Sequence, residues 1–285
     1  MKWTSGTQNS DVVDARGSRV SGGMKVGIGG GLGMVALVVI SQFLGVDLTG
    51  LIGTGGSGPP AGGAVDHREN KPTGPDADAE MVEFVRFVMK DIQDTFDGAY
   101  KSEGKQYKRA KLVLFTDAID TGCGRSSSAI GPFYCPPDQH AYIDLTFYRD
   151  LKAKLGAPGD FAQAYVLAHE IGHHIQTLEG IGRDQRFSSK SARNEASVRQ
   201  ELQADCFAGV WGHSAAARKL LEVGDLEEAI NAASAIGDDR LQKQSGRQVN
   251  PETFTHGTSA QRMKWFRRGF DTGRMSACDT FSEAP

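Results

Sequence analysis

The sequence lacks a charge excess of either sign, and it contains no long basic run. Its 32 Lys and Arg residues nearly balance its 35 Asp and Glu residues, which gives a formal net charge of −3. Proteins that bind nucleic acid usually carry clustered positive charge, so nucleic acid is not expected as a partner. The chain also lacks an evident internal repeat and any close Cys-x-x-Cys pair. The missing cysteine pair argues against a four-cysteine zinc site.

Glycine is unevenly distributed along the 285 residues. Of the 36 glycines, 18 fall within the first 75 residues. The rest of the chain, about 210 residues, is long enough for one globular domain with its own core. A content of 39% hydrophobic and 24% charged residues agrees with a globular protein.

An uncharged stretch of 21 residues, 26–46, lies within the glycine-rich part. A helix of this length spans a hydrocarbon core of about 30 Å, so we expect one transmembrane anchor. A cleaved signal peptide and a buried core helix are the alternatives, although the residues that follow are a poor cleavage site. Basic residues precede the stretch, and none follows it before Arg68. The positive-inside rule then places the N-terminus in the cytoplasm and the bulk of the chain outside it.

These features predict four segments. We expect a cytoplasmic tail at 1–25, the anchor at 26–46, a flexible linker at 47–77 and one domain at 78–285. The linker is expected because residues 48–75 hold eight glycines and four prolines in 28 positions, a composition that cannot form a packed core.

Hydrophobic periodicity predicts an α+β domain that is predominantly helical. Apolar residues recur at three- and four-residue steps over 79–98, which is typical of a core-facing helix. An apolar run at 111–115 and an alternating run at 142–147 predict strands, the second of them half-buried. Further helices are expected near 160–178, 194–212, 225–236 and 258–270. Thr258 and Gln261 are spaced as a capping box at the start of the last helix.

All four cysteines lie beyond the expected anchor. If that side is oxidising, an even number of them suggests two disulfides, for which three connectivities exist. A Cys123–Cys135 pair would close a loop rich in Gly, Pro and Ser, and a Cys206–Cys278 pair would tie a helix to the C-terminal tail. Four buried free thiols are the alternative.

The motif that carries chemistry is His169-Glu170-Ile171-Gly172-His173. Histidines four residues apart project from one face of a helix, so both imidazoles can bind one metal ion. Glu170 lies one step round the helix, beside the metal. This is the geometry of a His-Glu-x-x-His zinc site, in which the glutamate acts on the metal-bound water.

Two carboxylates on a second expected helix, Glu201 and Asp205, complete the pattern. A hydrolytic zinc site needs three protein ligands and one open position for water. Glu201 is the natural third ligand, and Asp205 is placed to accept a hydrogen bond from a ligating histidine. The residues around them are apolar, and buried carboxylates usually need partners, so a solvated acidic face is disfavoured.

His-Glu-x-x-His followed by Glu-x-x-x-Asp on a later helix resembles the gluzincin class of metallopeptidases. More closely, the chain resembles the YpfJ-like family of bacterial predicted neutral zinc metallopeptidases over its whole length. The segments that carry the resemblance are 131–136, 142–145, 169–176, 201–209, 237–240 and 256–259. The resemblance implies a zincin-like fold with a small β-sheet, one zinc ion and peptidase activity on peptides or proteins. With the expected anchor, it also implies a single-pass protein of the bacterial cell envelope whose catalytic domain is extracytoplasmic.

We therefore expect zinc-dependent peptide-bond hydrolysis. Two neutral histidines and one carboxylate leave a zinc site with a net charge of about +1, which lowers the pKa of bound water toward ~7. Glu170 takes a proton from that water and passes it to the leaving amine. In gluzincins a histidine or tyrosine from outside the motif often stabilises the oxyanion. His256 is the candidate here, with Tyr165 and Tyr142 as weaker ones, and a capping or loop role is the alternative for His256.

Two other functions stay open at this point. A membrane-tethered binding or scaffold protein could keep zinc for structure alone, but a structural zinc site normally has four protein ligands. Metal-dependent hydrolysis of a non-peptide bond fits the same ligands. If the strand at 142–147 is an edge, it could also receive an extended substrate by strand addition. Adjacent Asp238 and Asp239 are weak evidence for calcium, and a helix-terminus or salt-bridge role is preferred for them.

Overall fold

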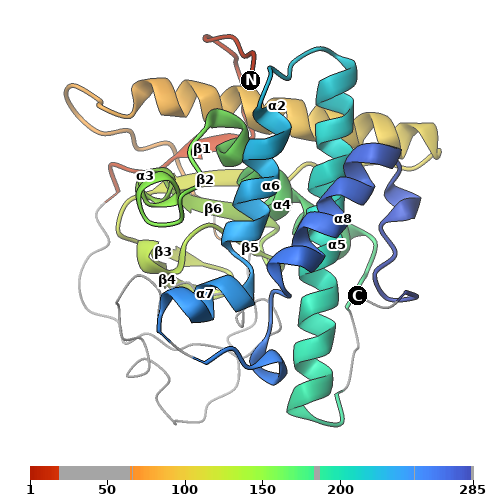
Figure 1. The fold of residues 1–285 in the computed structure, drawn as a ribbon. Helices are drawn as coiled ribbons and strands as arrows, with labels where there is room; N and C mark the ends of the chain where they lie inside the picture. Colours follow the sequence, from red (N-terminus) through yellow and green to blue (C-terminus); the bar gives the residue numbers. More distant parts are fainter. Residues whose placement is uncertain (19–64, 66, 183–186, 247, 284–285) are drawn as a thin grey trace.

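The computed structural model describes residues 1–18, 65, 67–182, 187–246 and 248–283. In this part of the chain a small sheet lies beside a group of packed helices (Figure 1). Helix α4 (Asp160–Leu178) is central, since it contacts α2 (Ala79–Ser102), α5 (Lys190–Ala217), α6 (Asp225–Ala235) and two strands of the sheet. The α+β class with a helical majority agrees with the expectation from the sequence.

The main sheet has the strand order β1-β2-β6-β5. Strands β1 (Val12–Asp14), β2 (Lys111–Phe115) and β6 (His140–Asp144) are parallel, and β5 (Phe133–Cys135) pairs antiparallel with β6. A separate hairpin is formed by β3 (Ala118–Thr121) and β4 (Gly124–Ser127).

Both faces of the main sheet are covered. Alternate residues of β2, Leu112 and Leu114, join the large core beneath the helices. Val113 and Phe115 point to a second apolar cluster on the other face, which includes Tyr142. A disulfide between Cys123 and Cys135 lies at this second cluster, with Cα atoms 5.9 Å apart.

The strand predicted at 142–147 needs three corrections. It begins earlier and ends at Asp144, because the Asp144 carboxylate accepts a hydrogen bond from the Thr146 amide at 2.9 Å and α3 (Thr146–Ala153) follows. The strand is buried on both faces, with Tyr142 at 0% exposure. It also lies between β2 and β5, so it is not the edge strand required for strand addition.

The remaining helices are close to the expected positions. Helix α5 extends past the predicted range at both ends, and α8 (Ser259–Thr272) begins with the predicted capping box of Thr258 and Gln261. The short helices α3 and α7 (Asp238–Gln244) were not predicted. Single 3-10 turns are found at Ser128–Ile130, Pro251–Thr253 and Met275–Ala277. The Cys206–Cys278 disulfide joins α5 to the C-terminal segment.

Residues 1–18 form part of the same folded unit as residues 67–283. Strand β1 is paired with β2 along its whole length, and the ammonium group of Met1 lies 2.5 Å from Asp160 Oδ1 at the start of α4. Arg16 binds both carboxylate oxygens of Asp14, at 2.9 and 2.8 Å, and also contacts Asp76. This differs from the expected division, in which residues 1–25 formed a separate tail and the domain began at 78. A strand of three residues is stable only when paired, and its partner is in the domain.

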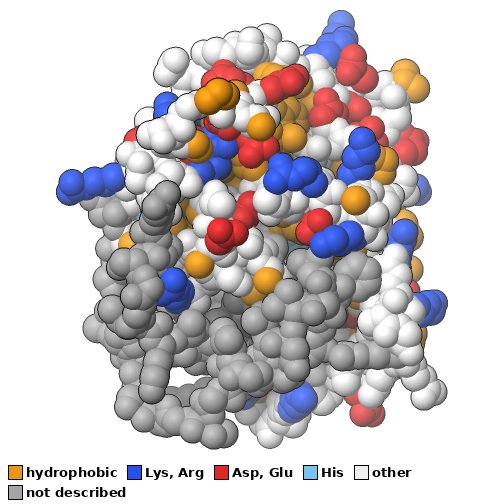
Figure 2. All heavy atoms as spheres, turned by 90° about the vertical axis from the view of Figure 1, so that its left-hand side faces the viewer, with side chains coloured by type: hydrophobic (Ala, Val, Ile, Leu, Met, Phe, Trp, Pro, Cys, Tyr) orange, Lys and Arg blue, Asp and Glu red, His pale blue; other side chains and the backbone are white. Residues whose placement is uncertain are grey.

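The predicted anchor at 26–46 and most of the predicted linker lie outside the described residues. Among the helices that the structure does describe, none combines the length and the apolar character needed to cross a bilayer. Figure 2 shows one face of the molecule, on which acidic and basic side chains are interspersed over the described surface.

Candidate metal centre

The centre is formed where α4 crosses α5. Gly172 of α4 lies against Ala204 of α5, and a Cβ atom at residue 172 would be 2.8 Å from the Ala204 Cα. Because the position carries no side chain, the two helix backbones approach closely. Beside this contact, both histidines of α4 face Glu201 of α5, and His169 also contacts Asp205.

Three of the expected ligands converge. His169, His173 and Glu201 each offer one donor atom, and these atoms lie within 4.8 Å of one another. His169 Nε2 is 3.1 Å from one Glu201 oxygen, and His173 Nε2 is 3.5 Å from the other. Two imidazole nitrogens and one carboxylate oxygen are the donor set of many catalytic zinc sites, so these side chains fit a zinc ion. In the described part of the chain one other cluster qualifies, Asp160, Asp225 and Glu228, but its donors are all carboxylates.

In both histidines, Nδ1 forms a hydrogen bond on the side of the ring away from Glu201. His169 Nδ1 lies 2.8 Å from Asp205 Oδ1, and since a carboxylate only accepts, the ring nitrogen donates. His173 Nδ1 lies 2.9 Å from the Gln176 side-chain oxygen, and the Gln176 amide group donates to the Gln200 carbonyl oxygen. With Nδ1 engaged, Nε2 of each ring is directed toward Glu201. This arrangement suits metal ligation by Nε2.

The charges of the centre depend strongly on one another. Burial disfavours the imidazolium form of His169, but the adjacent Asp205 and Glu201 carboxylates outweigh it and raise the pKa of His169 to about 9. Burial would raise the pKa of Glu201, yet the charge of His173 and the hydrogen bond from His169 lower it well below its usual range. Without a metal, a proton shared with His169 therefore offsets part of the negative charge of these carboxylates.

Glu170 is placed beside the ligands without joining them. Its side chain is buried, at 8% exposure, and burial raises the pKa of its carboxyl group against the opposing charges of His173 and His169. A carboxylate in this setting binds a proton more readily than an exposed one, which is the property that a general base in neutral solution needs.

His256 also lies near the centre, at the loop before α8. Burial lowers its pKa, but the hydrogen bond to Asp238 and the charge of Glu201 raise it above the usual value. Asp238 accepts from His256 Nδ1 at 3.1 Å and from the backbone amides of residues 255–257. Nε2 of His256 is buried and has no hydrogen-bond partner. Asp238 therefore fixes the imidazole and leaves one polar atom of the ring unused.

The two tyrosines considered as alternatives are engaged elsewhere. The hydroxyl of Tyr165 donates to Asp205 at 2.5 Å, behind His169. The hydroxyl of Tyr142 donates to Asp138 at 2.7 Å in the cluster on the far face of the sheet. A third tyrosine, Tyr148 of α3, was not considered from the sequence. Burial and the charge of Glu170 raise its pKa, and its buried hydroxyl has no hydrogen-bond partner.

Arg262 of α8 is the second residue that sequence reasoning missed. Its side chain is 1% exposed and binds both oxygens of Asp205, at 2.7 and 2.8 Å. A signal was present in the sequence, because Arg262 shares the buried face of α8 with Trp265 and Phe266, three and four residues further on. An arginine on such a face needs a buried anionic partner.

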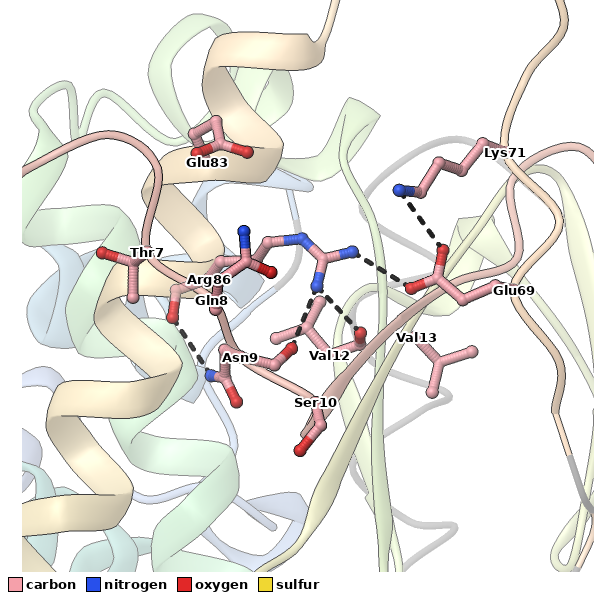
Figure 3. Close-up of a pocket in the computed structure, with 10 residues that line it drawn as sticks. All are labelled: Thr7, Gln8, Asn9, Ser10, Val12, Val13, Glu69, Lys71, Glu83 and Arg86. Atoms are coloured by element: carbon pink, nitrogen blue, oxygen red, sulfur yellow. Dashed lines mark hydrogen bonds and ion pairs between the residues drawn. The ribbon is translucent and has the colours of Figure 1, made fainter.

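Two surface hollows lie away from the metal centre. One, of about 640 Å³, is lined by the N-terminal segment and α2 (Figure 3). Arg86 crosses it, donating to the carbonyl oxygens of Asn9 and Val12 and pairing with Glu69. The polar groups of the hollow thus bind one another. Its described lining residues contain no cluster of histidines and carboxylates like that of the metal centre.

Comparison with known proteins agrees with this geometry. Residues 1–281 match a family described as "putative neutral zinc metallopeptidase". The chain is 46% identical to the uncharacterised protein YpfJ of Escherichia coli K12 over 296 aligned positions, which cover 100% of both chains. It is 43% identical to the uncharacterised protein Rv2575 of Mycobacterium tuberculosis over 218 positions, which cover 72% of this chain and 74% of the other. No solved structure matches it significantly. The chain belongs to this family, as its motifs led us to expect.

Proposed function

We propose that the protein is a zinc-dependent peptidase in which Glu170 is the general base. The observation that carries the proposal is the ligand group His169, His173 and Glu201. Among the described residues no further His, Cys, Asp or Glu completes this group to four. Structural zinc sites normally have four protein ligands, whereas hydrolytic sites keep one position for water. The donor set therefore supports catalysis over the alternative of a scaffold protein that holds zinc for structure alone.

The proposed role of Glu170 is proton transfer. A zinc ion held by the three ligands would supply a Lewis acid that polarises the scissile carbonyl group and acidifies water. The Glu170 carboxylate takes a proton from the attacking water as the new C–O bond forms. The same proton then passes to the amide nitrogen as the C–N bond breaks, which leaves a carboxylic acid and an amine; the acid's remaining proton then passes to the amine. The raised pKa of Glu170 supports this double role, because the group must both accept and release a proton near neutral pH.

Two unpartnered polar groups are candidates to bind the substrate's carbonyl oxygen. His256, protonated, could donate from Nε2 while Asp238 holds its other nitrogen. Tyr148 could donate its hydroxyl from the side of Glu170. Buried polar groups without partners are destabilising, so their presence at a site supports a role toward a ligand. The candidate donors are therefore His256, which the sequence suggested, and Tyr148, which the structure adds. Tyr165 and Tyr142 are no longer candidates, because their hydroxyl groups are engaged elsewhere.

An extracytoplasmic location of the folded unit is a further part of the proposal. The two disulfides support an oxidising compartment for the folded unit. Because residues 1–18 pack with the domain, they would share that compartment. A single span at 26–46 would separate residues 1–18 from the domain, so the proposal departs here from the expected anchor and from the positive-inside rule, which placed the N-terminus in the cytoplasm.

The experiment compares wild type with Glu170→Gln for zinc content and for cleavage of a broad peptide library. We expect equal zinc in both proteins and at least a 10³-fold loss of cleavage in the variant, since the amide cannot accept the proton. Glu179→Gln, at the end of the same helix, is the matched control and should retain both properties. Cleavage by Glu170→Gln at the wild-type rate would refute the mechanism. Zinc-loaded wild type without any cleavage would favour the scaffold function.

A further inference from the structure

Arg262 lies directly behind the metal centre, with its Nη2 atom 3.3 Å from Nδ1 of His169. Because that nitrogen donates to Asp205, it cannot also accept a hydrogen bond from Arg262. Its guanidinium group donates from Nε and Nη2 to the two oxygens of Asp205, and Nη2 also reaches the Tyr165 hydroxyl at 3.2 Å. Asp205 in turn accepts from His169 Nδ1 at 2.8 Å. A continuous chain of contacts thus runs from α8 through α5 to a metal ligand on α4.

The sequence brings α8 close enough for this contact through two glycines. A Cβ atom at Gly209 of α5 would overlap the carbonyl oxygen of Phe266, and one at Gly269 of α8 would overlap that of Cys206. The Cys206–Cys278 disulfide lies at the same crossing, next to Asp205 in the chain. The short distance between α5 and α8 therefore depends on a glycine in each helix.

We propose that Arg262 is a positioning residue for the metal centre, and that it acts on His169 through Asp205. The proposal rests on the proposed zinc site and assigns a role to a residue outside it. Asp205 has 0% exposure, and without a partner for both oxygens its carboxylate would be free to rotate. The bidentate pair with Arg262 fixes the plane of the carboxylate, because a guanidinium group binds both carboxylate oxygens in one geometry. The fixed oxygen then holds Nδ1 of His169, so that Nε2 stays directed toward Glu201.

A test must separate this role from general stability, because breaking a buried ion pair destabilises most proteins. Zinc affinity, measured by competition with a chromophoric chelator, is a suitable readout that does not depend on activity. We expect Arg262→Met to weaken zinc binding by about 10- to 100-fold, the usual effect of removing a residue that orients a ligand. Arg262→Lys should weaken it several-fold, since an ammonium group keeps the charge but cannot hold both oxygens.

Arg16 provides the matched control. It forms a buried bidentate pair with Asp14, with contacts of 2.9 and 2.8 Å, on strand β1. Arg16→Met removes a pair of the same kind and should lower the melting temperature, but its zinc affinity should stay within twofold of wild type.

A double-mutant cycle tests whether Arg262 acts through Asp205. In an Asp205→Asn background, Arg262→Met should change zinc affinity less than threefold, because the carboxylate that it positions is gone. An equally large loss in both backgrounds would overturn the proposal. If Arg262→Met does not fold, wild-type zinc affinity in Arg262→Lys would overturn it as well. If wild type and Arg262→Met bind zinc with the same measurable affinity, this inference alone is overturned. If wild type does not bind zinc at all, the proposed function is overturned too.

Discussion

Gly172 and Ala204 are in contact at the crossing of α4 and α5. A Cβ atom added at residue 172 would lie 2.8 Å from the Cα of Ala204 and 2.9 Å from its carbonyl oxygen. Since the obstructing atoms belong to the backbone, a side chain there cannot be accommodated by a rotamer change. The separation of the helices that carry the ligands is thus set by the absence of a side chain within the His-Glu-x-x-His motif itself.

Gly172→Ala should separate the two helices and weaken the metal centre. We expect a loss of stability of about 2 kcal/mol, in the range found for overpacked cores, together with at least tenfold weaker zinc binding. Chemical denaturation and chelator competition measure the two effects.

The control for this change is Gly98→Ala, also in a helix interior. No atom lies within 4 Å of the Cβ position at Gly98, and the residue is exposed. Alanine there should raise stability by about 0.5–1 kcal/mol through helix propensity. Unchanged zinc affinity in Gly172→Ala would show that the crossing does not set the ligand geometry.

Tyr148→Phe should lower catalysis without disturbing the fold. Its hydroxyl has no partner to lose, so stability should stay constant or rise slightly. If this hydroxyl binds the developing oxyanion, kcat should fall by about 10²- to 10³-fold with zinc content unchanged. Steady-state kinetics on a cleaved library peptide, with a thermal melt, provide both measurements.

Tyr107→Phe supplies the comparison. The Tyr107 hydroxyl donates to Gln93 at 2.6 Å, so its removal should cost about 1 kcal/mol of stability and leave kcat as in wild type. Should Tyr148→Phe behave in the same way, with lower stability and normal kcat, its hydroxyl is structural and not catalytic.

The metal ligands could be predicted from the sequence because helix geometry alone determines their spacing. His169 and His173 on one helix, and Glu201 and Asp205 on another, are pairs at i and i+4. The chain resembles its family at the same residues, and the structure brings these side chains together. His256 was a candidate on the sequence, and Asp238, which fixes it, was expected at a helix terminus or in a salt bridge; the sequence did not indicate that His256 is its partner.

Contacts that depend on tertiary structure were not predictable in this way. Strand β1 has three residues in a glycine-rich region, and its partner is about a hundred residues away in the chain, with Val12 beside Leu112. Alternation suggested that residues 142–147 form one strand, but the Asp144 carboxylate accepts a hydrogen bond from the Thr146 amide, and a helix begins there instead. Arg262 could be recognised as buried from its helix face, but nothing local identifies Asp205 as its partner.

The stability of the metal-free protein should depend on pH through His169. Its pKa is raised to about 9 in the fold, above the usual value of 6.5. Protonated His169 therefore stabilises the fold fully below pH 6.5, and this stabilisation is lost as the pH rises through 9. The free energy of unfolding should fall by roughly 3 kcal/mol in total. Urea denaturation in the presence of a chelator, repeated between pH 6 and 10, measures it. Excess zinc should abolish this fall, because the metal replaces the proton on the imidazole; a fall that persists with zinc bound would contradict the assignment to His169.

Residues 1–18 and the metal centre should lie on the same side of any membrane. Strand β1 is hydrogen-bonded to β2, and the Gly17 amide donates to the Asn70 carbonyl oxygen at 2.6 Å. A hydrocarbon core of about 30 Å cannot separate groups that are in contact. All four native cysteines are in disulfides, so one added cysteine is the sole free thiol for labelling.

Ser5→Cys and Ser282→Cys place that thiol at exposed positions near the two ends of the described fold. A membrane-impermeant maleimide applied to intact bacterial cells should label both variants to the same extent, relative to the total thiol measured after lysis. Labelling of Ser282→Cys without labelling of Ser5→Cys would instead fit a tail that stays in the cytoplasm. In that event β1 could not pair with β2 in the cell, and the edge of the sheet beside Leu112 and Leu114 would have to be covered by another segment.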